Sequence, residues 1–225
     1  MKKPIKIVIA VVCSLVVAVG LVLAISFAVL AGKTNYIDDD YSFVYADEKY
    51  RAAVGVEDIE VITQEISCGY AVIQMFSAWK GGSVTEQSLF EQYGKVVTST
   101  GNSFCKEFNK QFPEYQTKSY KYLKNSELID KVYKSLADGI PVPFEWAAKY
   151  HGEWTLHYSL IIGMDIPNDT VMIANPYGYI EQLSLKDFLD RTSFQAFKNM
   201  PFFYRLAFAF GIFEKNTIFI ASKTI

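Results

Sequence analysis

Hydrophobic and polar positions divide the chain into a uniformly apolar segment near its amino terminus and a longer mixed remainder. No charged residue occurs from Ile7 to Ala31. Because an α-helix rises about 1.5 Å per residue, about 20 such residues cross the hydrocarbon core of a bilayer. Three lysines come before the segment: Lys2, Lys3 and Lys6. An excess of lysine before a span predicts a cytoplasmic amino terminus and an exported remainder.

The apolar segment has two interpretations. We expect a retained signal-anchor over residues 1–32, because the segment exceeds the about 7–15 apolar residues of a cleaved signal peptide. The protein is then a single-pass protein of the cell membrane with its domain outside. Alternatively, a signal peptidase cleaves after Ala31, at Val29-Leu30-Ala31, and the domain is secreted. The polar, acidic residues 33–53 predict a juxtamembrane linker, and residues 54–225 predict a single domain.

The first half of that domain has helical periodicity. Apolar residues recur at i, i+1, i+4, i+5 and i+8 after Ser67-Cys68-Gly69: Ala71, Val72, Met75, Phe76 and Trp79. This spacing predicts one apolar face of a helix that ends at Gly81-Gly82. Three further helices are expected over residues 83–93, where Ser83 to Glu86 match a capping box, over residues 103–112 and over residues 125–138.

The second half has strand-like patterns. Residues 140–146 contain two prolines, which is typical of an edge strand or a strand start. His157 to Met164 predict a buried strand, because most of these residues are apolar. The Pro-Asn-Asp sequence within residues 165–169 predicts a hairpin turn, and residues 170–174 predict the partner strand.

The carboxyl-terminal part contributes three smaller elements. Ser184 is expected to cap a short helix over residues 185–189, and residues 217–222 to form a closing strand. The Phe-rich segment from Pro201 to Ile212 is too short for a confident membrane span, so we expect it in the core, with a membrane-facing or contact surface as the alternative. Helices first and an antiparallel sheet second indicate an α+β fold.

Composition narrows the classes of function. The 22 basic and 24 acidic residues give a net charge of −2, which offers no electrostatic basis for binding nucleic acid. A hydrophobic content of 51% excludes wholesale disorder. Three cysteines are too few for a disulfide scaffold, and two histidines without an HExxH or CxxC motif predict no metal site. Without a Walker or GxGxxG loop, no cofactor is expected.

Cys68, His157 and Asn175 are candidates for a nucleophile, a base and an orienting group. Cys68 begins the first predicted helix of the domain, where the partial positive charge of a helix amino terminus lowers a thiol pKa. His157 opens a buried strand, so at the edge of the core it could accept the thiol proton. Asn175 leaves the hairpin that His157 enters, so the two side chains are expected at adjacent strand ends.

Each candidate also has a structural interpretation. Cys68 could be inert or disulfide-bonded to Cys105, His157 could be a core histidine, and Asn175 could belong to a turn. Gln64, four residues before Cys68, could donate a hydrogen bond to an oxyanion together with the backbone N–H of Cys68, or be a solvated loop residue. The order of cysteine, histidine and asparagine on these elements favours catalysis.

Three motifs carry a resemblance to a known family. Gln64 to Ala71 resemble the nucleophile motif of the C39-like papain-fold cysteine peptidases, and His157 to Asp165 are similar to their histidine strand. Val171 to Gly178 resemble the strand that delivers the third catalytic residue. The resemblance implies a papain-like fold with Cys68 as nucleophile, His157 as base, Asn175 as orienting residue and a glutamine at the oxyanion. The family commonly has Asp at the third position, and Gln64 lies closer to the cysteine than the usual glutamine.

Together these observations predict a membrane-anchored, extracytoplasmic cysteine peptidase that acts on a peptide or protein substrate. Two alternatives stay open. The same Cys–His pair could transfer the acyl group to an amine, because both reactions share an acyl-enzyme. Alternatively, the papain fold could be a catalytically inactive binding or interaction module.

Overall fold

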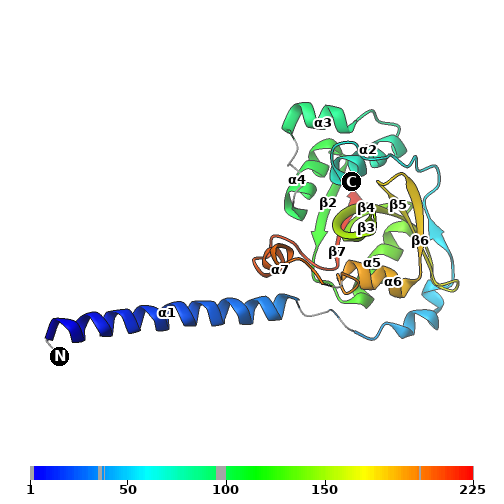
Figure 1. Ribbon diagram of the computed structural model, residues 1–225. Coiled ribbons are helices and arrows are strands. Elements are labelled where there is room, and N and C mark those ends of the chain that lie inside the picture. Colours follow the sequence, from blue (N-terminus) through cyan, green and yellow to red (C-terminus); the bar gives the residue numbers. More distant parts are fainter. Residues whose placement is uncertain (1–2, 35–36, 38, 95–99, 198, 225) are drawn as a thin grey trace. The chain divides into compact units, whose positions relative to one another are not determined.

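The computed structural model describes residues 3–34, 37, 39–94, 100–197 and 199–224 (Figure 1). The chain divides into two compact units, Met1–Asn35 with Pro201–Phe213 and Tyr36–Met200 with Glu214–Ile225. Lys2 of the predicted signal-anchor lies outside the described residues, as do residues 35, 36 and 38 of the predicted linker.

The first unit contains two helices, α1 (Lys3–Thr34) and α7 (Phe202–Ala209). Within α1, Val8–Ser26 have a mean hydropathy of 3.1 and none of this stretch is buried. By length and composition it can cross a membrane, although a signal sequence meets the same criteria. The expectation that the Phe-rich segment lies in the core was wrong for Phe202 and Phe203, which are exposed, whereas Phe208 and Ala209 are buried.

The second unit is built on one antiparallel sheet. In the described part of the chain the sheet has seven strands, with the order β2–β7–β3–β4–β5–β6 and with β1 paired to β4. The strands are β1 (Val54–Gly55), β2 (Tyr115–Tyr120), β3 (Val142–Tyr150), β4 (Glu153–Asp165), β5 (Thr170–Asn175), β6 (Tyr179–Leu183) and β7 (Thr217–Lys223).

Helices pack on both faces of this sheet. They are α2 (Cys68–Trp79), α3 (Glu86–Tyr93), α4 (Gly101–Gln111), α5 (Asn125–Ala137) and α6 (Leu185–Thr192), preceded by the 3₁₀ turns η1 (Ser42–Tyr45) and η2 (Glu48–Tyr50). Successive strand residues point to opposite faces, so each strand contributes to two cores.

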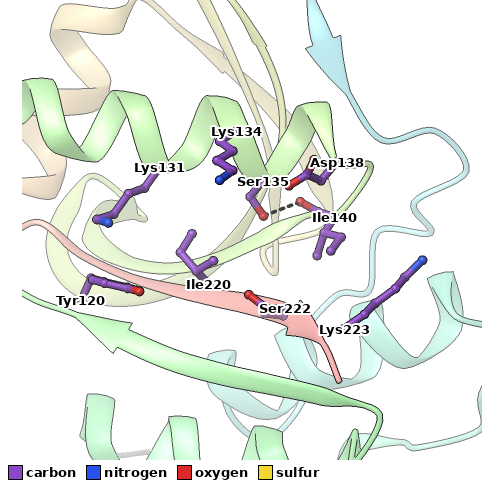
Figure 2. A pocket seen from close by; sticks show the side chains of 10 residues that line it. Tyr120, Lys131, Lys134, Ser135, Asp138, Ile140, Ile220, Ser222 and Lys223 are labelled. Atoms are coloured by element: carbon purple, nitrogen blue, oxygen red, sulfur yellow. Dashed lines mark hydrogen bonds between the residues drawn. The ribbon is translucent and has the colours of Figure 1, made fainter. Parts of the chain in front are cut away.

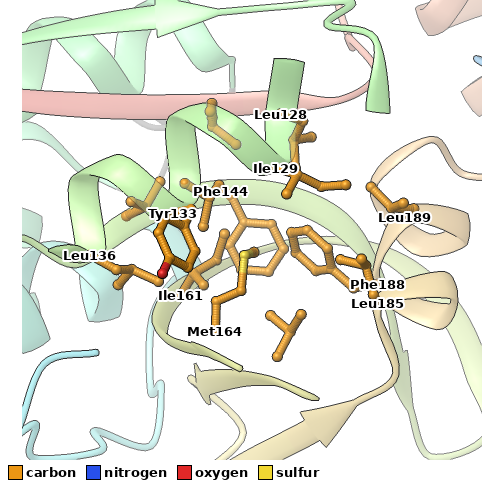
Figure 3. Close-up of a cluster of buried hydrophobic side chains, with 14 of the residues drawn as sticks. Leu128, Ile129, Tyr133, Leu136, Phe144, Ile161, Met164, Leu185, Phe188 and Leu189 are labelled. Carbon is orange, nitrogen blue, oxygen red and sulfur yellow. The ribbon is translucent and has the colours of Figure 1, made fainter. Parts of the chain in front are cut away.

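One core lies between the sheet and helices α5 and α6 (Figure 3). Figure 3 shows Phe144 of β3 beside Phe188 of α6, with Ile161 of β4 in the same cluster. Val44 and Tyr50, within the predicted linker, belong to this core. The other core joins α2, α3 and α4 to the opposite face, where Tyr70 and Phe104 are fully buried.

The α+β prediction is confirmed, and so is the hairpin. β4 pairs with β5 from Leu160↔Ala174 to Asp165↔Thr170, while His157 and Tyr158 lie beyond the end of this ladder. The predicted helix over 83–93 begins later, at Glu86, because Thr85 and Ser88 form the capping box in place of Ser83 and Glu86. Strands β2 and β6 were not predicted, since both are short and largely polar.

Candidate active site

Cys68 is the first residue of α2, and the loop before it is fixed by hydrogen bonds to Glu86, a residue of the next helix. The Ser67 hydroxyl caps the helix by accepting from the backbone N–H of Tyr70 at 3.3 Å. The buried Glu86 carboxylate at the start of α3 accepts three backbone N–H groups, from Glu65 at 3.1 Å and from Ile66 and Ser67 at 2.9 Å each. Because charged acceptors make strong hydrogen bonds, Glu86 defines the path of the chain into Cys68.

The Cys68 thiol lies against the backbone of β4. It is partly exposed and receives backbone hydrogen bonds from Tyr158, from Gly69 and from its own N–H. Burial nevertheless raises the pKa of the thiol to about 11, and the nearby Glu145 adds to the increase. The expectation of a lowered thiol pKa was therefore wrong for the free protein, because desolvation outweighs the helix amino terminus and the backbone donors.

The structure also answers whether Cys68 is a free thiol or is disulfide-bonded to Cys105. Both Cys68 and Cys105 are free thiols, so the Cys68–Cys105 disulfide is not formed. The Cys105 sulfur instead donates to the carbonyl oxygen of Thr117 at 3.2 Å.

His157 lies near the start of β4 and contacts Asn175 at the end of β5. The His157 Nε2 and the Asn175 Oδ1 are 3.0 Å apart. Since an amide oxygen can only accept, Nε2 carries the proton and donates it, and Nδ1 is left as the unprotonated nitrogen. The Tyr177 ring stacks on the imidazole, with ring centroids 4.1 Å apart and an interplanar angle of 18°. Burial lowers the pKa of His157 to about 4, although the bond to Asn175 opposes this decrease.

The orientation of the Asn175 amide is determined by its other partners. Asn175 Oδ1 also accepts from the backbone N–H of Tyr177 at 3.0 Å, and Asn175 Nδ2 donates to Glu181 Oε2 at 2.9 Å. Because a carboxylate only accepts, the amide nitrogen must face Glu181 and the amide oxygen must face His157. Arg191 Nη1 donates to Glu181 Oε1 at 2.6 Å and holds the carboxylate in place.

Gln64 lies beside the turn that follows Asn175. Its backbone N–H donates to the carbonyl oxygen of Pro176 at 2.7 Å, and its neighbour Thr63 pairs with Tyr177. The side-chain Oε1 of Gln64 is buried and has no hydrogen-bond partner in the described part of the chain. The structure thus brings the Gln64 backbone to the Asn175 turn, while the predicted oxyanion role stays a prediction.

Sequence reasoning missed three of the polar groups around these residues: Glu86, Glu181 and Glu145. For Glu86 the sequence pattern indicated only a helix cap. Glu181 and Glu145 stand in strands β6 and β3, where nothing in the local pattern marks a contact with Asn175 or Cys68. The register places Glu145 opposite Tyr158, the residue next to His157, which is visible only once β3 and β4 are paired.

Cavities in the described part of this unit differ in how they relate to the site residues. One of about 440 Å³ is lined by residues of β2, α5 and β7, including Lys131, Lys134 and Ser222 (Figure 2), and none of the predicted site residues line it. A second, of about 300 Å³, is lined by Ile66 and Glu86, among others, and so borders the loop before Cys68. Among the residues that the structure describes, no group of three or more His, Cys, Asp or Glu side chains could hold a metal ion.

Comparisons with known proteins place the chain in a family. The chain is similar to the crystal structure of a double glycine motif protease from an AMS/PCAT transporter in complex with the leader peptide. The match has 15% identity and a TM-score of 0.49, and it covers 76% of this chain and 95% of that one. No curated protein matches the chain. The model of the Peptidase_C39 like family matches residues 56–201, more than half of the chain. The chain therefore belongs to the Peptidase_C39 like family.

Proposed function

We propose that the domain is a cysteine peptidase, a thiol hydrolase of peptide or amide bonds, with Cys68 as nucleophile, His157 as base and Asn175 as orienting residue. The observation that carries the proposal is the hydrogen bond from His157 Nε2 to Asn175 Oδ1. This bond leaves Nδ1 free to act as a base, and the Cys68 thiol hydrogen-bonds to the backbone of Tyr158, the residue after His157.

The resting pair is neutral, so the thiol is activated during the reaction. As Cys68 Sγ attacks the substrate carbonyl carbon, its proton passes to His157 Nδ1. Collapse of the tetrahedral intermediate breaks the C–N bond, and the amine leaves with the proton from His157. Water then attacks the thioester while His157 accepts a water proton, and return of that proton to sulfur releases the carboxylic acid and the free thiol.

The negative oxygen of the intermediate needs donors. The backbone N–H of Cys68 is the proposed backbone donor: at the start of a helix it lacks an intrahelical acceptor, and it would turn from its own sulfur to the oxyanion. The Gln64 amide is the proposed side-chain donor. The cavity beside Ile66 and Glu86 offers space for part of a peptide or protein substrate.

The proposal includes a membrane anchor. The apolar stretch Val8–Ser26 of α1 supports a single span, and Lys3 and Lys6 before it favour a cytoplasmic amino terminus with the domain outside. Cleavage after Ala31 would instead give a secreted domain. Mass spectrometry of the amino-terminal peptide from membranes of an expressing cell separates the two, because only a retained anchor yields peptides preceding Ala31.

The test of catalysis compares the two free thiols of the domain. The full chain in nonionic detergent is incubated with a mixture of peptides and with a peptidyl electrophile, and labelled sulfurs are mapped by mass spectrometry. We expect peptide hydrolysis by the wild type and by Cys105→Ala, and none by Cys68→Ala or His157→Ala. Full hydrolysis by Cys68→Ala would exclude the proposed nucleophile.

The same experiment weighs the alternatives. The raised thiol pKa is the observation that favours an inactive binding module, because a neutral thiol reacts slowly. An electrophile that labels Cys68 no faster than Cys105, with no hydrolysis, would support that module. If adding a primary amine gives amide products in place of acids, the domain is an acyltransferase.

A further inference from the structure

The helix α7 and the turn that follows it present large apolar side chains to their surroundings. Phe202, Phe203 and Phe210 keep 63%, 80% and 72% of their surface exposed, and Ile212 is also exposed. A few exposed apolar residues are normal on a soluble protein, but a contiguous group of aromatic side chains marks a surface that meets a partner or a membrane.

Not all of the segment is exposed. Phe208 is buried and contacts the ring of Phe213, with centroids 5.9 Å apart, and Tyr204 contacts the same ring at 6.1 Å. The exposed phenylalanines therefore belong to a folded helical segment with an inner side. They are presented outward by a defined structure.

The segment belongs with the apolar helix α1. Residues Pro201–Phe213 and Met1–Asn35 form one compact unit, and the backbones of α1 and α7 contact each other. The candidate span Val8–Ser26 has no buried part, and in the proposed anchor its apolar side chains face lipid. A segment in contact with such a helix is placed where lipid is the available apolar partner.

The length and charge of the segment define how it could meet lipid. Only Phe202–Ala209 are helical, and even a helix from Pro201 to Phe213 would span only about 20 Å at about 1.5 Å per residue, too short to cross a hydrocarbon core of about 30 Å. It carries no acidic residue and one cation, Arg205, which is exposed. Apolar side chains with a flanking cation are typical of helices that lie in the headgroup region, where aromatic rings also concentrate.

We propose that residues 201–213, which consist of α7 and the turn after it, are a second membrane contact that lies in the bilayer interface and inserts Phe202, Phe203 and Phe210 among the lipids. The inference rests on the proposed membrane anchor. On both sides this segment continues into the second unit, which holds the proposed catalytic residues and is here called the catalytic unit, at Met200 and Glu214. Insertion attaches the catalytic unit to the membrane at two further points of the chain, which favours substrates that are themselves at the membrane.

Depth-dependent quenching in the full chain tests this inference. In a Cys13→Ala, Cys68→Ala and Cys105→Ala background, a single cysteine at Phe203→Cys carries an environment-sensitive fluorophore. The protein is reconstituted into phosphatidylcholine–phosphatidylglycerol vesicles that contain a lipid nitroxide, placed near the headgroup or near the end of the acyl chain. Ile180→Cys on β6 is the matched control, because it is also an exposed apolar residue but belongs to the other unit. Val16→Cys reports on the span itself.

We expect the headgroup-region nitroxide to quench the probe at Phe203→Cys at least about threefold more than the probe at Ile180→Cys. The probe at Val16→Cys is quenched most by the deep nitroxide. Equal quenching at positions 203 and 180, with position 16 quenched, overturns the interface segment but keeps the anchor. Quenching at position 203 without quenching at position 16 supports the interface segment and overturns the anchor.

Discussion

Replacing the buried Glu145 by its neutral isostere should make the domain more stable at alkaline pH. Glu145 lies in β3, opposite Thr217 of β7 and Tyr158 of β4, and is only 3% exposed. Burial raises the pKa of its carboxyl from 4.5 to about 8, and the charge of Glu214 adds to this increase while Lys121 opposes it. The carboxyl is therefore protonated at neutral pH in the folded protein but ionised in the unfolded chain.

The sign and size follow from proton linkage. A folded-state pKa above the unfolded value favours folding below about pH 4.5, and this contribution is lost as the pH rises to about 8. A tenfold change in the acid constant corresponds to about 1.4 kcal/mol, so the wild type loses about 4 kcal/mol of unfolding free energy between pH 5 and pH 9 through this group. The Glu145→Gln variant should not show this loss of unfolding free energy, because a glutamine side chain does not titrate.

The assay is urea denaturation of the full chain in nonionic detergent at pH 5, 7 and 9, followed by tryptophan fluorescence. Subtracting the wild-type unfolding free energy from that of Glu145→Gln cancels the titrating groups that do not interact with Glu145, and the difference should grow by about 4 kcal/mol across the range. Glu57→Gln, at an exposed position, is the control and should show no such growth. If the Glu145→Gln difference is the same at all three pH values, the carboxyl is not held protonated by burial and the reasoning is wrong.

Three further predictions concern the site. Asn175→Asp places a second carboxylate about 2.9 Å from that of Glu181. Repulsion between the two charges should reduce peptide hydrolysis and lower the free energy of unfolding by about 2–4 kcal/mol, and adding Glu181→Gln should restore much of both. No recovery in the double variant would contradict this repulsion. Glu86→Gln keeps the shape of the side chain but removes the charged group that accepts from three backbone N–H groups. Denaturation should therefore show an unfolding free energy lower by about 2–3 kcal/mol, and kcat should drop more than KM rises. Gly178 has φ +93°, and an added Cβ would collide with Thr63 Oγ1. Gly178→Ala should therefore lower stability by about 1–3 kcal/mol in a thermal melt and reduce activity. A wild-type Tm would show that the turn adapts.

Local patterns along the chain are enough to predict most elements and the order of the candidate catalytic residues. The apolar spacing after Cys68 predicts α2, and the Pro-Asn-Asp turn predicts the β4–β5 hairpin. Because a hairpin brings its two ends together, the amino-acid sequence alone predicts that His157 and Asn175 lie side by side, and they do. Such inferences succeed because helix period, strand alternation and turn residues are encoded within about ten neighbouring positions.

How the site is held and charged depends instead on packing between distant segments. Glu86 reaches the loop before Cys68 from α3, and Glu181 reaches Asn175 from β6. The thiol pKa rises because packing removes water from Cys68, although its place on the helix alone predicts a decrease. The exposure of Phe203 likewise contradicts an apolar pattern that is typical of a core. Burial and desolvation follow from how the elements pack, and the hydrophobic pattern does not distinguish a protein core from a lipid bilayer as the apolar partner.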